Sequence, residues 1–423
     1  MAITRQPTKA HKPWFQYLFG HICGMLDATG PLTPTLNPSV TGVIAPPIPA
    51  AHGWAARYDG SWGPMLDLCQ AVPGYPPHTG LLEHLATAAG EPGSAKYGLI
   101  NGDTALREIY AAQVSATYGG DIGPNQVAIT AGCNQAFFLA MMTIARPGDS
   151  VLLPTPWFWN HQQTCTMLGI EPRSLPCTAS AGFVPDPGQA EALLDPSVRA
   201  VVLITPNNPT GAVYPPGVIA AFAAVCRRRG IWLILDETYR DFLPDGQDRA
   251  HDLFAGPSWI NSVIQLYSFS KAYCVPGHRL GAIVAGEALV QQFMKVLDCL
   301  HICPQRAGQA ALCWAIDALP DWRASNRRTI NARAAAVRQA FDRLPEWRLE
   351  SLGAYFAYVR HPMPGTPSAQ VAETLAADRG ALCLPGSAFG PGQDGHLRIA
   401  FANTDTTDIP QIAERLAALP RSD

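Results

Sequence analysis

Short runs of hydrophobic residues recur along the middle of the chain, and stretches with helical spacing separate them. The runs are uniformly apolar rather than alternating, which is typical of strands covered on both faces. The predicted strands are residues 127–130, 151–153, 200–204, 231–235, 263–267 and 279–285. Strands that alternate with helices favour an α/β fold, in which a mostly parallel sheet lies between two layers of helices.

The same pattern divides the chain into three parts. Residues 1–74 are rich in proline and glycine, and we expect an extended arm that completes part of a smaller domain. Residues 75–318 carry the alternating strands and helices of a large domain. Residues 319–423 predict the rest of the smaller α+β domain. Its expected elements are helices at 323–344 and 408–419 and strands at 353–359 and 396–401.

Composition excludes some classes of protein. Of 423 residues, 48% are hydrophobic, which is enough for a large core, and the net charge of −3 gives no electrostatic basis for binding nucleic acid. We expect the basic run at residues 227–229 to end a helix over residues 216–229.

The eleven cysteines are scattered without metal-binding spacing, which predicts reduced thiols in the cytoplasm and no metal. No run reaches the roughly 18 apolar residues of a membrane span. The N-terminus has no apolar core followed by a cleavage site, so secretion is not expected.

A lysine follows directly after one predicted strand. Lys271 closes the run YSFSK at residues 267–271, and Arg279 comes eight positions later. A lysine on a loop that leaves a buried strand is partly desolvated, which lowers its pKa and frees its amine to condense with a carbonyl. The hydroxyls of Ser268 and Ser270 and the guanidinium of Arg279 suit a phosphate beside that carbonyl. Alone, the run describes an ordinary surface lysine better, but three further motifs reverse this reading.

Polar side chains also follow two other predicted strands. Asn208, in the run NNPTG, comes after residues 200–204, and its amide can donate to a phenolate oxygen. Asp236 ends the apolar run 231–235, where a carboxylate needs a facing cation such as a protonated pyridine nitrogen. Tyr239 can reach the oxygen of the same ring. Taken singly, these residues also fit an Asn-Pro turn and a helix N-cap.

A glycine turn joins a further strand to a helix. Residues 127–136, VAITAGCNQA, place Gly132 between the two, so that backbone N–H groups and the helix dipole face an anion. As a lone phosphate signal this motif is weak.

The order and spacing of these motifs resemble the fold-type I aminotransferases of class I and II, the aspartate aminotransferase superfamily, over about residues 97–398. The resemblance implies a large domain with a mostly parallel seven-stranded sheet and a smaller α+β domain. It also implies the cofactor pyridoxal 5′-phosphate (PLP), held as a Schiff base by Lys271, with Asp236 at the pyridine nitrogen. Catalytic roles would fall to Lys271, Asp236 and Tyr239. The other cofactor contacts implied are Gly132, Cys133, Asn134, Phe158, Asn208, Ser268 and Arg279.

The resemblance also implies a homodimer that binds small-molecule substrates. Tyr97 aligns with a tyrosine that reaches the phosphate in the neighbouring subunit, so the two active sites would be shared. Arg398 aligns with the arginine that clamps a substrate α-carboxylate, with Asn208 and Ala71 also at the substrate. His161 would either support Asp236 from behind or be a structural histidine.

The implied function is transfer of an amino group between an L-amino acid and a 2-oxo acid. A PLP-dependent lyase or synthase that eliminates or replaces a substituent remains an alternative, since its cofactor contacts are the same. A non-catalytic PLP-sensing module of a transcription regulator is a third reading. The many prolines and few basic residues before residue 75 argue against its DNA-binding domain.

The substrate side chain leaves fewer signals. Ala71 stands where the family often has glycine, which reshapes the pocket entrance. Arg306 and Arg360 are the candidates for a second arginine that would bind a dicarboxylate. The aromatic run at residues 157–159 instead favours a neutral apolar or aromatic side chain over aspartate. Further aromatic residues lie in the arm, namely Trp14, Phe15 and Tyr17.

Overall fold

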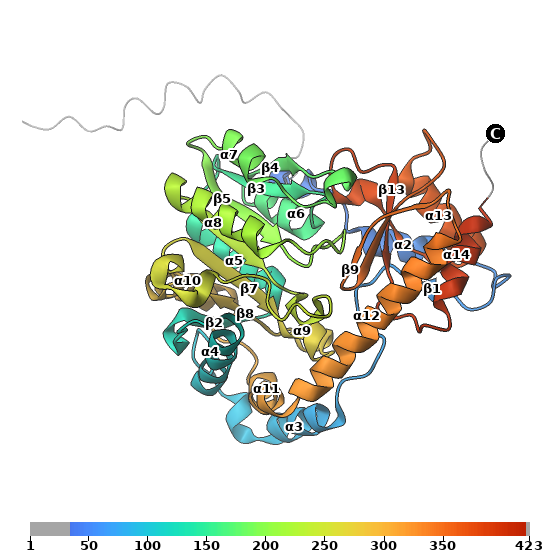
Figure 1. The fold of residues 1–423 in the computed structure, drawn as a ribbon. Helices are drawn as coiled ribbons and strands as arrows, with labels where there is room; N and C mark the ends of the chain where they lie inside the picture. The colour runs from blue at the N-terminus through green and yellow to red at the C-terminus, as the bar shows by residue number, and fades with distance from the viewer. Residues whose placement is uncertain (1–33, 420–423) are drawn as a thin grey trace, which may run out of the picture.

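A seven-stranded sheet forms the centre of the larger part of the molecule, on the left in Figure 1. The structure, a computed structural model, describes residues 34–419. In spatial order the sheet runs β2-β8-β7-β6-β5-β3-β4; β8 is antiparallel to both neighbours and the remaining neighbours are parallel. The mostly parallel sheet is therefore confirmed. Its strands are β2 (Val127–Thr130), β3 (Ser150–Thr155), β4 (Glu171–Pro176), β5 (Val198–Ile204), β6 (Trp232–Asp236), β7 (Val263–Ser268) and β8 (Gly281–Val284).

The prediction missed β4, whose sequence EPRSLP contains two prolines and two charged residues. This strand lies at the edge of the sheet, and most of its side chains are partly exposed. Edge strands tolerate proline and charge because one of their sides has no hydrogen-bonding neighbour. The apolar signal that marks the central strands is therefore absent from β4.

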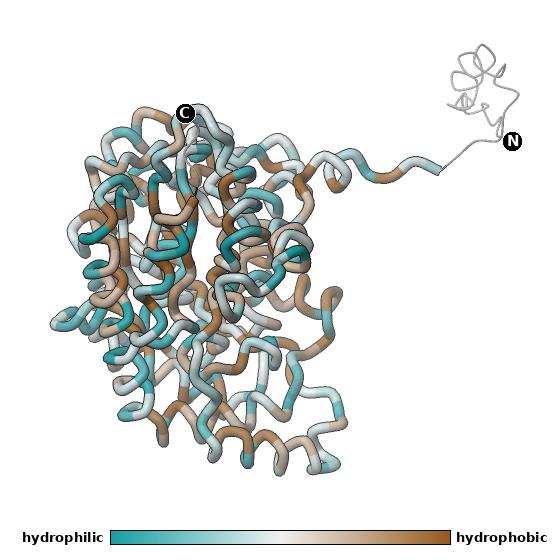
Figure 2. The backbone as a smooth tube through the Cα atoms, turned by 90° about the vertical axis from the view of Figure 1, so that its right-hand side faces the viewer, coloured by the Kyte–Doolittle hydropathy of each residue, from teal (hydrophilic) through white to brown (hydrophobic). Residues whose placement is uncertain are grey.

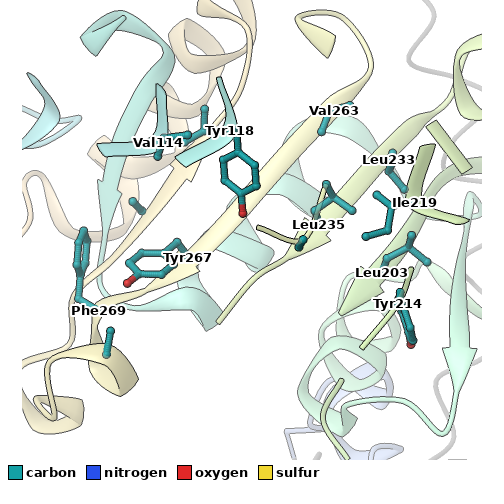
Figure 3. Close-up of a cluster of buried hydrophobic side chains, with 14 of the residues drawn as sticks. Val114, Tyr118, Leu203, Tyr214, Ile219, Leu233, Leu235, Val263, Tyr267 and Phe269 are labelled. Atoms are coloured by element: carbon teal, nitrogen blue, oxygen red, sulfur yellow. The ribbon is translucent and has the colours of Figure 1, made fainter. Parts of the chain in front are cut away.

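Helices cover both faces of the sheet. Leu233 and Leu235 of β6 belong to one hydrophobic cluster with α4, α8 and α11, and Figure 3 shows part of it. Ile234 belongs to a second cluster on the other face with α5 and α10. This alternation along one strand explains why the central runs are apolar at every position. The helices of this part are α3 (Thr79–Gly90), α4 (Thr104–Tyr118), α5 (Cys133–Ile144), α6 (Trp159–Met167), α7 (Pro187–Ala192), α8 (Pro216–Arg229), α9 (Phe269–Ala272), α10 (Glu287–His301) and α11 (Arg306–Ala318).

The predicted end of α8 is confirmed. The basic run lies in its last turn, and Gly230 follows with a φ of 64°. Arg228 and Arg229 contact Glu191 at 2.9 and 3.3 Å. These arginines therefore stabilise the carboxyl end of α8. No helix among residues 34–419 is long and apolar enough to cross a membrane.

A second, antiparallel sheet lies beside the first, and the long helix α12 runs between the two parts (Figure 1). The strand predicted at 353–359 corresponds to β10, but it begins later than expected, because the chain reverses at Ala354, whose φ is 44°. A hairpin therefore occupies this stretch. The sheet, in spatial order, contains β12 (Leu384–Pro385), β13 (His396–Ala400), β10 (Phe356–Arg360) and β9 (Arg348–Gly353). Its helices are α12 (Pro320–Asp342), α13 (Ser368–Arg379) and α14 (Ile409–Ala417).

The described part of the arm is only partly extended. It contains α1 (Pro38–Thr41), α2 (Pro47–Ala55) and β1 (Leu66–Asp67), so the expected extended arm is wrong where these two helices lie. Its first described residues project from the body of the molecule (Figure 2). β1 pairs with β11 (Ala381–Leu382) and α2 packs on α13, so the arm does join the smaller part. The exact limits of the three parts stay a prediction, and Trp14, Phe15 and Tyr17 lie outside the described residues.

Candidate active site

A cavity of about 290 Å³ opens at the carboxyl ends of β5, β6 and β7, beside the second sheet. Open α/β sheets place ligands at this edge, because loops from successive strands meet there. The structure brings most of the predicted site residues together around this cavity. They are Ala71, Cys133, Asn134, Phe158, Asn208, Asp236, Tyr239, Ser268, Lys271, Arg279 and Arg398.

Lys271 lies in α9, the single helical turn that follows β7. Its Nζ donates a hydrogen bond to the carbonyl oxygen of Ala71 at 2.5 Å. Burial and the positive charges of Arg398 and Arg279 lower the pKa of Lys271 to about 8. An amine with this pKa is partly neutral near physiological pH, so it can act as a nucleophile or as a base.

Asp236 ends β6 and is 4% exposed. Its carboxylate accepts a hydrogen bond from the backbone N–H of Thr238 at 3.0 Å, and His161 Nε2 lies 3.3 Å away. Burial alone would raise the pKa of this carboxyl, but His161 and Thr238 hold it below its ordinary value. Asp236 is therefore ionised and suited to a cationic ring nitrogen. His161 stacks on Phe137 with 3.8 Å between ring centroids, which fixes its position behind the acid.

Asn208 and Tyr239 supply hydrogen-bond donors to the same cavity. The Oδ1 of Asn208 accepts a hydrogen bond from Arg398 Nη1 at 3.1 Å, which leaves its NH₂ group to donate elsewhere. Burial raises the pKa of Tyr239, so its hydroxyl keeps its proton and can donate. Together the two side chains suit an anionic oxygen on a ring.

Arg398 is a buried cation on β13 and is 2% exposed. Its Nη2 donates to the carbonyl oxygen of Cys69, and the rings of Phe356 and Phe389 lie 5.1 and 5.3 Å from its guanidinium carbon. Burial lowers its pKa to about 10, so it stays charged at neutral pH. None of the carboxylates in residues 34–419 forms an ion pair with it. A buried guanidinium without such a partner is suited to a carboxylate ligand.

The start of α5 forms a cradle for an anion. Gly132 has a φ of 87°, and a Cβ on it would lie 2.2 Å from Arg279 Nη2, so the guanidinium reaches the helix start only because this residue is glycine. Ser270 Oγ is buried and has no hydrogen-bond partner in the described chain. A helix N-terminus, a guanidinium and an unpaired hydroxyl fit a phosphate group.

Three of the predicted residues lie elsewhere on this chain. Tyr97 is 78% exposed and does not line the cavity. Arg306 is paired with Asp103 at 3.3 Å, and Arg360 with Glu350 at 2.9 Å, so neither is available to a dicarboxylate in this cavity.

The sequence reading missed Ile48, Gln70 and Asn160, which line the cavity, and it named Trp159 only as part of the aromatic run at residues 157–159. Ile48 belongs to α2 of the arm and reaches the site only through packing between distant segments. Trp159 and Asn160 adjoin Phe158, so the aromatic run was their signal, but the run does not show which members face inward.

A partly neutral lysine, an ionised acid and an anion cradle around one cavity, at this edge of a mostly parallel sheet, define a PLP enzyme of fold type I. Solved structures have the same fold. Aspartate aminotransferase from Thermus thermophilus in a structure with maleate is similar with a TM-score of 0.83 and 23% identity, over 91% of this chain and 99% of that chain. The aspartate aminotransferase from Rhizobium meliloti also has a TM-score of 0.83, with 23% identity over 91% and 98%.

Residues 64–416 match the family described as aminotransferase class I and II, and the chain belongs to that family. An aromatic aminotransferase of Arabidopsis thaliana, ISS1, is 27% identical over 83% of this chain and 88% of its own. The arginine–pyruvate transaminase AruH of Pseudomonas aeruginosa is 28% identical over 73% and 78%. The protein is thus an aminotransferase, and its cofactor is PLP.

Proposed function

We propose that this aminotransferase exchanges the amino group between a neutral or aromatic L-amino acid and a 2-oxo acid, with Lys271 as cofactor anchor and proton carrier. The observation that carries the proposal is the meeting of three groups at one cavity. Lys271 supplies an amine of lowered pKa, Asp236 an ionised acid, and Arg398 a buried cation without a carboxylate partner in the described chain.

When bound, PLP supplies an aldehyde that takes up an amino group and a protonated ring that withdraws electrons. Asp236 would keep the ring nitrogen protonated, and Asn208 and Tyr239 would donate hydrogen bonds to the ring oxygen. Phe158 would pack against the ring. The phosphate would lie among the residues at the start of α5 and after β7, namely Gly132, Cys133, Asn134, Ser268, Ser270 and Arg279.

The chain's own groups then account for proton transfer. Arg398 holds the substrate α-carboxylate bidentately and so orients the Cα–H bond. Lys271, as a neutral amine, would take the proton from Cα and return it to the 4′ carbon of the cofactor, two bonds away. Its pKa of about 8 suits both directions, since an effective acid–base group titrates near the working pH.

The lining supports a neutral substrate side chain. Among residues 34–419, the lysines and arginines at the cavity are Lys271, Arg279 and Arg398, and each already has a role above. Ile48 and Trp159 add apolar surface instead. We expect single-turnover rates for phenylalanine and methionine to exceed that for aspartate; a clear preference for aspartate would refute this specificity.

A homodimer with shared sites is part of the proposal. Tyr97 and Leu99 are 78% and 51% exposed, and Leu300 and Ile302 on the nearby end of α10 are 43% and 42% exposed. The backbone N–H of Gly98 contacts Cys303 Sγ at 3.3 Å, which joins these two segments into one apolar face. Such a face suits a second copy of the chain, which would receive Tyr97 at its cavity.

We also propose that the enzyme works in the cytoplasm. The cysteines among the described residues are free thiols, and most of them are buried. Reduced thiols are typical of that compartment.

Product stoichiometry tests the proposed reaction against elimination or replacement. Purified enzyme is mixed with one amino acid, and the 2-oxo acid formed is counted per active site. An aminotransferase releases about one equivalent without an acceptor, because the cofactor keeps the amino group, and many equivalents once a second 2-oxo acid is added. Continuous release of 2-oxo acid and ammonia without an acceptor would show a lyase instead.

A further inference from the structure

A cluster of polar side chains lies behind the cavity, on the opposite face of β6 and β7. Its centre is Glu237, which has no exposed surface. The carboxylate accepts a hydrogen bond from Tyr118 Oη at 2.6 Å and another from Gln265 Nε2. His251 Nε2 lies 3.0 Å from it, and Arg240 Nη1 lies 3.8 Å from it. These five residues are called the Glu237 cluster below.

The cluster and the cavity share one short segment of chain. Successive side chains on a strand point to opposite faces. Asp236 accordingly faces the cavity, and Glu237 faces the layer that contains α4. Beyond the strand, Tyr239 lines the cavity, whereas Arg240, the first residue of a 3₁₀ turn (Arg240–Phe242), contacts Glu237 again. Any shift of the cluster therefore moves residues on the cavity side.

The cluster also joins β6 to β7. Gln265 belongs to β7, and so does Tyr267, whose ring centroid lies 4.0 Å from the guanidinium carbon of Arg240. Figure 3 shows Tyr118 and Tyr267 over this face of the sheet. Lys271 follows the end of β7 within one helical turn. These contacts thus connect the end of β6, which carries Asp236, to the end of β7, which is followed by Lys271.

Stability alone does not account for such a cluster. Burial alone would raise the pKa of Glu237, but His251 and Arg240 lower it below its ordinary value, so the carboxylate is charged. Buried ion pairs often stabilise a fold no better than apolar side chains of the same volume. Two hydrogen bonds reach Glu237 Oε2, whereas Glu237 Oε1, His251 Nε2 and Arg240 Nη1 have no hydrogen-bond partner in the described chain. The cluster therefore holds its members through those two hydrogen bonds and through the attraction between buried opposite charges, which is strong at low dielectric.

We propose that Glu237 is a positioning residue, whose contacts hold the ends of β6 and β7 in one register so that Asp236 and Lys271 keep their separation across the cavity. The inference rests on the proposed roles of those two residues. Its consequence is kinetic, because a displacement of about 1 Å at reacting groups can cost up to about 100-fold in rate.

The variant Glu237→Gln tests the proposal, because it keeps the size of the side chain and removes the charge that faces Arg240 and His251. We expect kcat to fall about 10- to 100-fold, with KM for the amino acid within about twofold of wild type. The affinity of the apoprotein for PLP, measured by titration without substrate, falls about tenfold because Asp236 is no longer held at the ring nitrogen. Tyr118→Phe, which deletes one hydrogen bond without changing charge, shifts both quantities in the same direction by about threefold.

Asp149→Asn is the matched control. Asp149 is 6% exposed and pairs with Arg199 at 3.0 Å, at the start of β3 and so at the opposite end of the strands from the cavity. Asp149→Asn loses a buried carboxylate, as Glu237→Gln does. Its kcat and its PLP affinity should nevertheless stay at wild-type values, even if its melting temperature falls.

If Glu237→Gln lowers only the melting temperature, as Asp149→Asn does, the cluster is merely structural and the proposal fails. Should Glu237→Gln not fold, Tyr118→Phe decides in the same way. A wild-type protein that neither binds PLP nor transaminates would instead overturn the proposed function, so the two failures are distinguishable.

Discussion

Single residues carry the chemistry of this protein because their surroundings change their charge. The pKa of Lys271 is lowered to about 8 by burial and by two neighbouring arginines. Arg398 remains charged in a site with no carboxylate partner among the described residues. The first effect provides a reactive amine, and the second provides a place for a substrate carboxylate.

The rate of cofactor uptake should report the Lys271 pKa. The neutral amine is the form that reacts with an aldehyde, and its fraction grows as pH rises through about 8. We therefore expect the rate at which the apoprotein takes up PLP to rise with pH and to level off above that value, as followed by stopped-flow absorbance. A midpoint near 10.5, the ordinary lysine value, would show that the site does not lower the pKa.

Arg398→Lys should lower kcat/KM for the amino acid and leave PLP binding unchanged. A lysine keeps the positive charge but loses the planar pair of donors, so kcat/KM for the amino acid falls about 10- to 100-fold. The matched control is Arg360→Lys, since Arg360 lies on the adjacent strand β10 and contacts Glu350 outside the cavity. Equal kcat/KM in the two variants would remove Arg398 from the substrate site.

At the scale of elements, the central strands and the residues at their ends could be predicted from sequence. Buried parallel strands are apolar throughout, and an acid or amide directly after such a run stands out, as at Asp236 and Asn208. The edge strand β4 lacks this signal. The turn at Ala354 could not be foreseen either, because its left-handed backbone is imposed by the hairpin around it rather than by a glycine.

The turn before α5 can be tested with two glycines of equal strain. Gly132 and Gly148 have φ values of 87° and 90°, but a Cβ would meet Arg279 at Gly132 and nothing within 4 Å at Gly148. Both alanine variants should lose stability, since alanine disfavours a positive φ. Only Gly132→Ala should also weaken PLP binding, by about tenfold or more, because it displaces Arg279 from the phosphate. Equal PLP affinity in both variants, measured by titration of the apoprotein, would contradict the cradle.

For the whole molecule, the active site depends on segments far apart in sequence. Ile48 from the arm, Asp236 from the large sheet and Arg398 from the smaller one line the same cavity. The sequence identified Asp236 because an acid that ends an apolar run is conspicuous, and Arg398 through the family resemblance. Ile48 has no distinguishing feature in the sequence, so its position at the cavity follows only from how α2 packs.

Mixing two defective subunits tests whether the sites are shared. Tyr97→Ala should bind PLP weakly, and Lys271→Ala should be inactive. In a hybrid dimer, the intact Lys271 of one subunit meets the intact Tyr97 of the other, so one complete site is restored. At limiting PLP we expect the mixture to reach about a quarter of wild-type activity, since half of randomly mixed dimers are hybrids with one complete site each. No gain over Tyr97→Ala alone would place Tyr97 outside the partner's site.

Borohydride reduction followed by peptide mass spectrometry tests the central claim most directly, because it makes the bond between the enzyme amine and the PLP aldehyde permanent. The account predicts a pyridoxyl phosphate group on the peptide that contains Lys271, and none on the corresponding peptide of Lys271→Ala. A modified lysine elsewhere, or an unmodified Lys271 peptide from enzyme saturated with PLP, would contradict it.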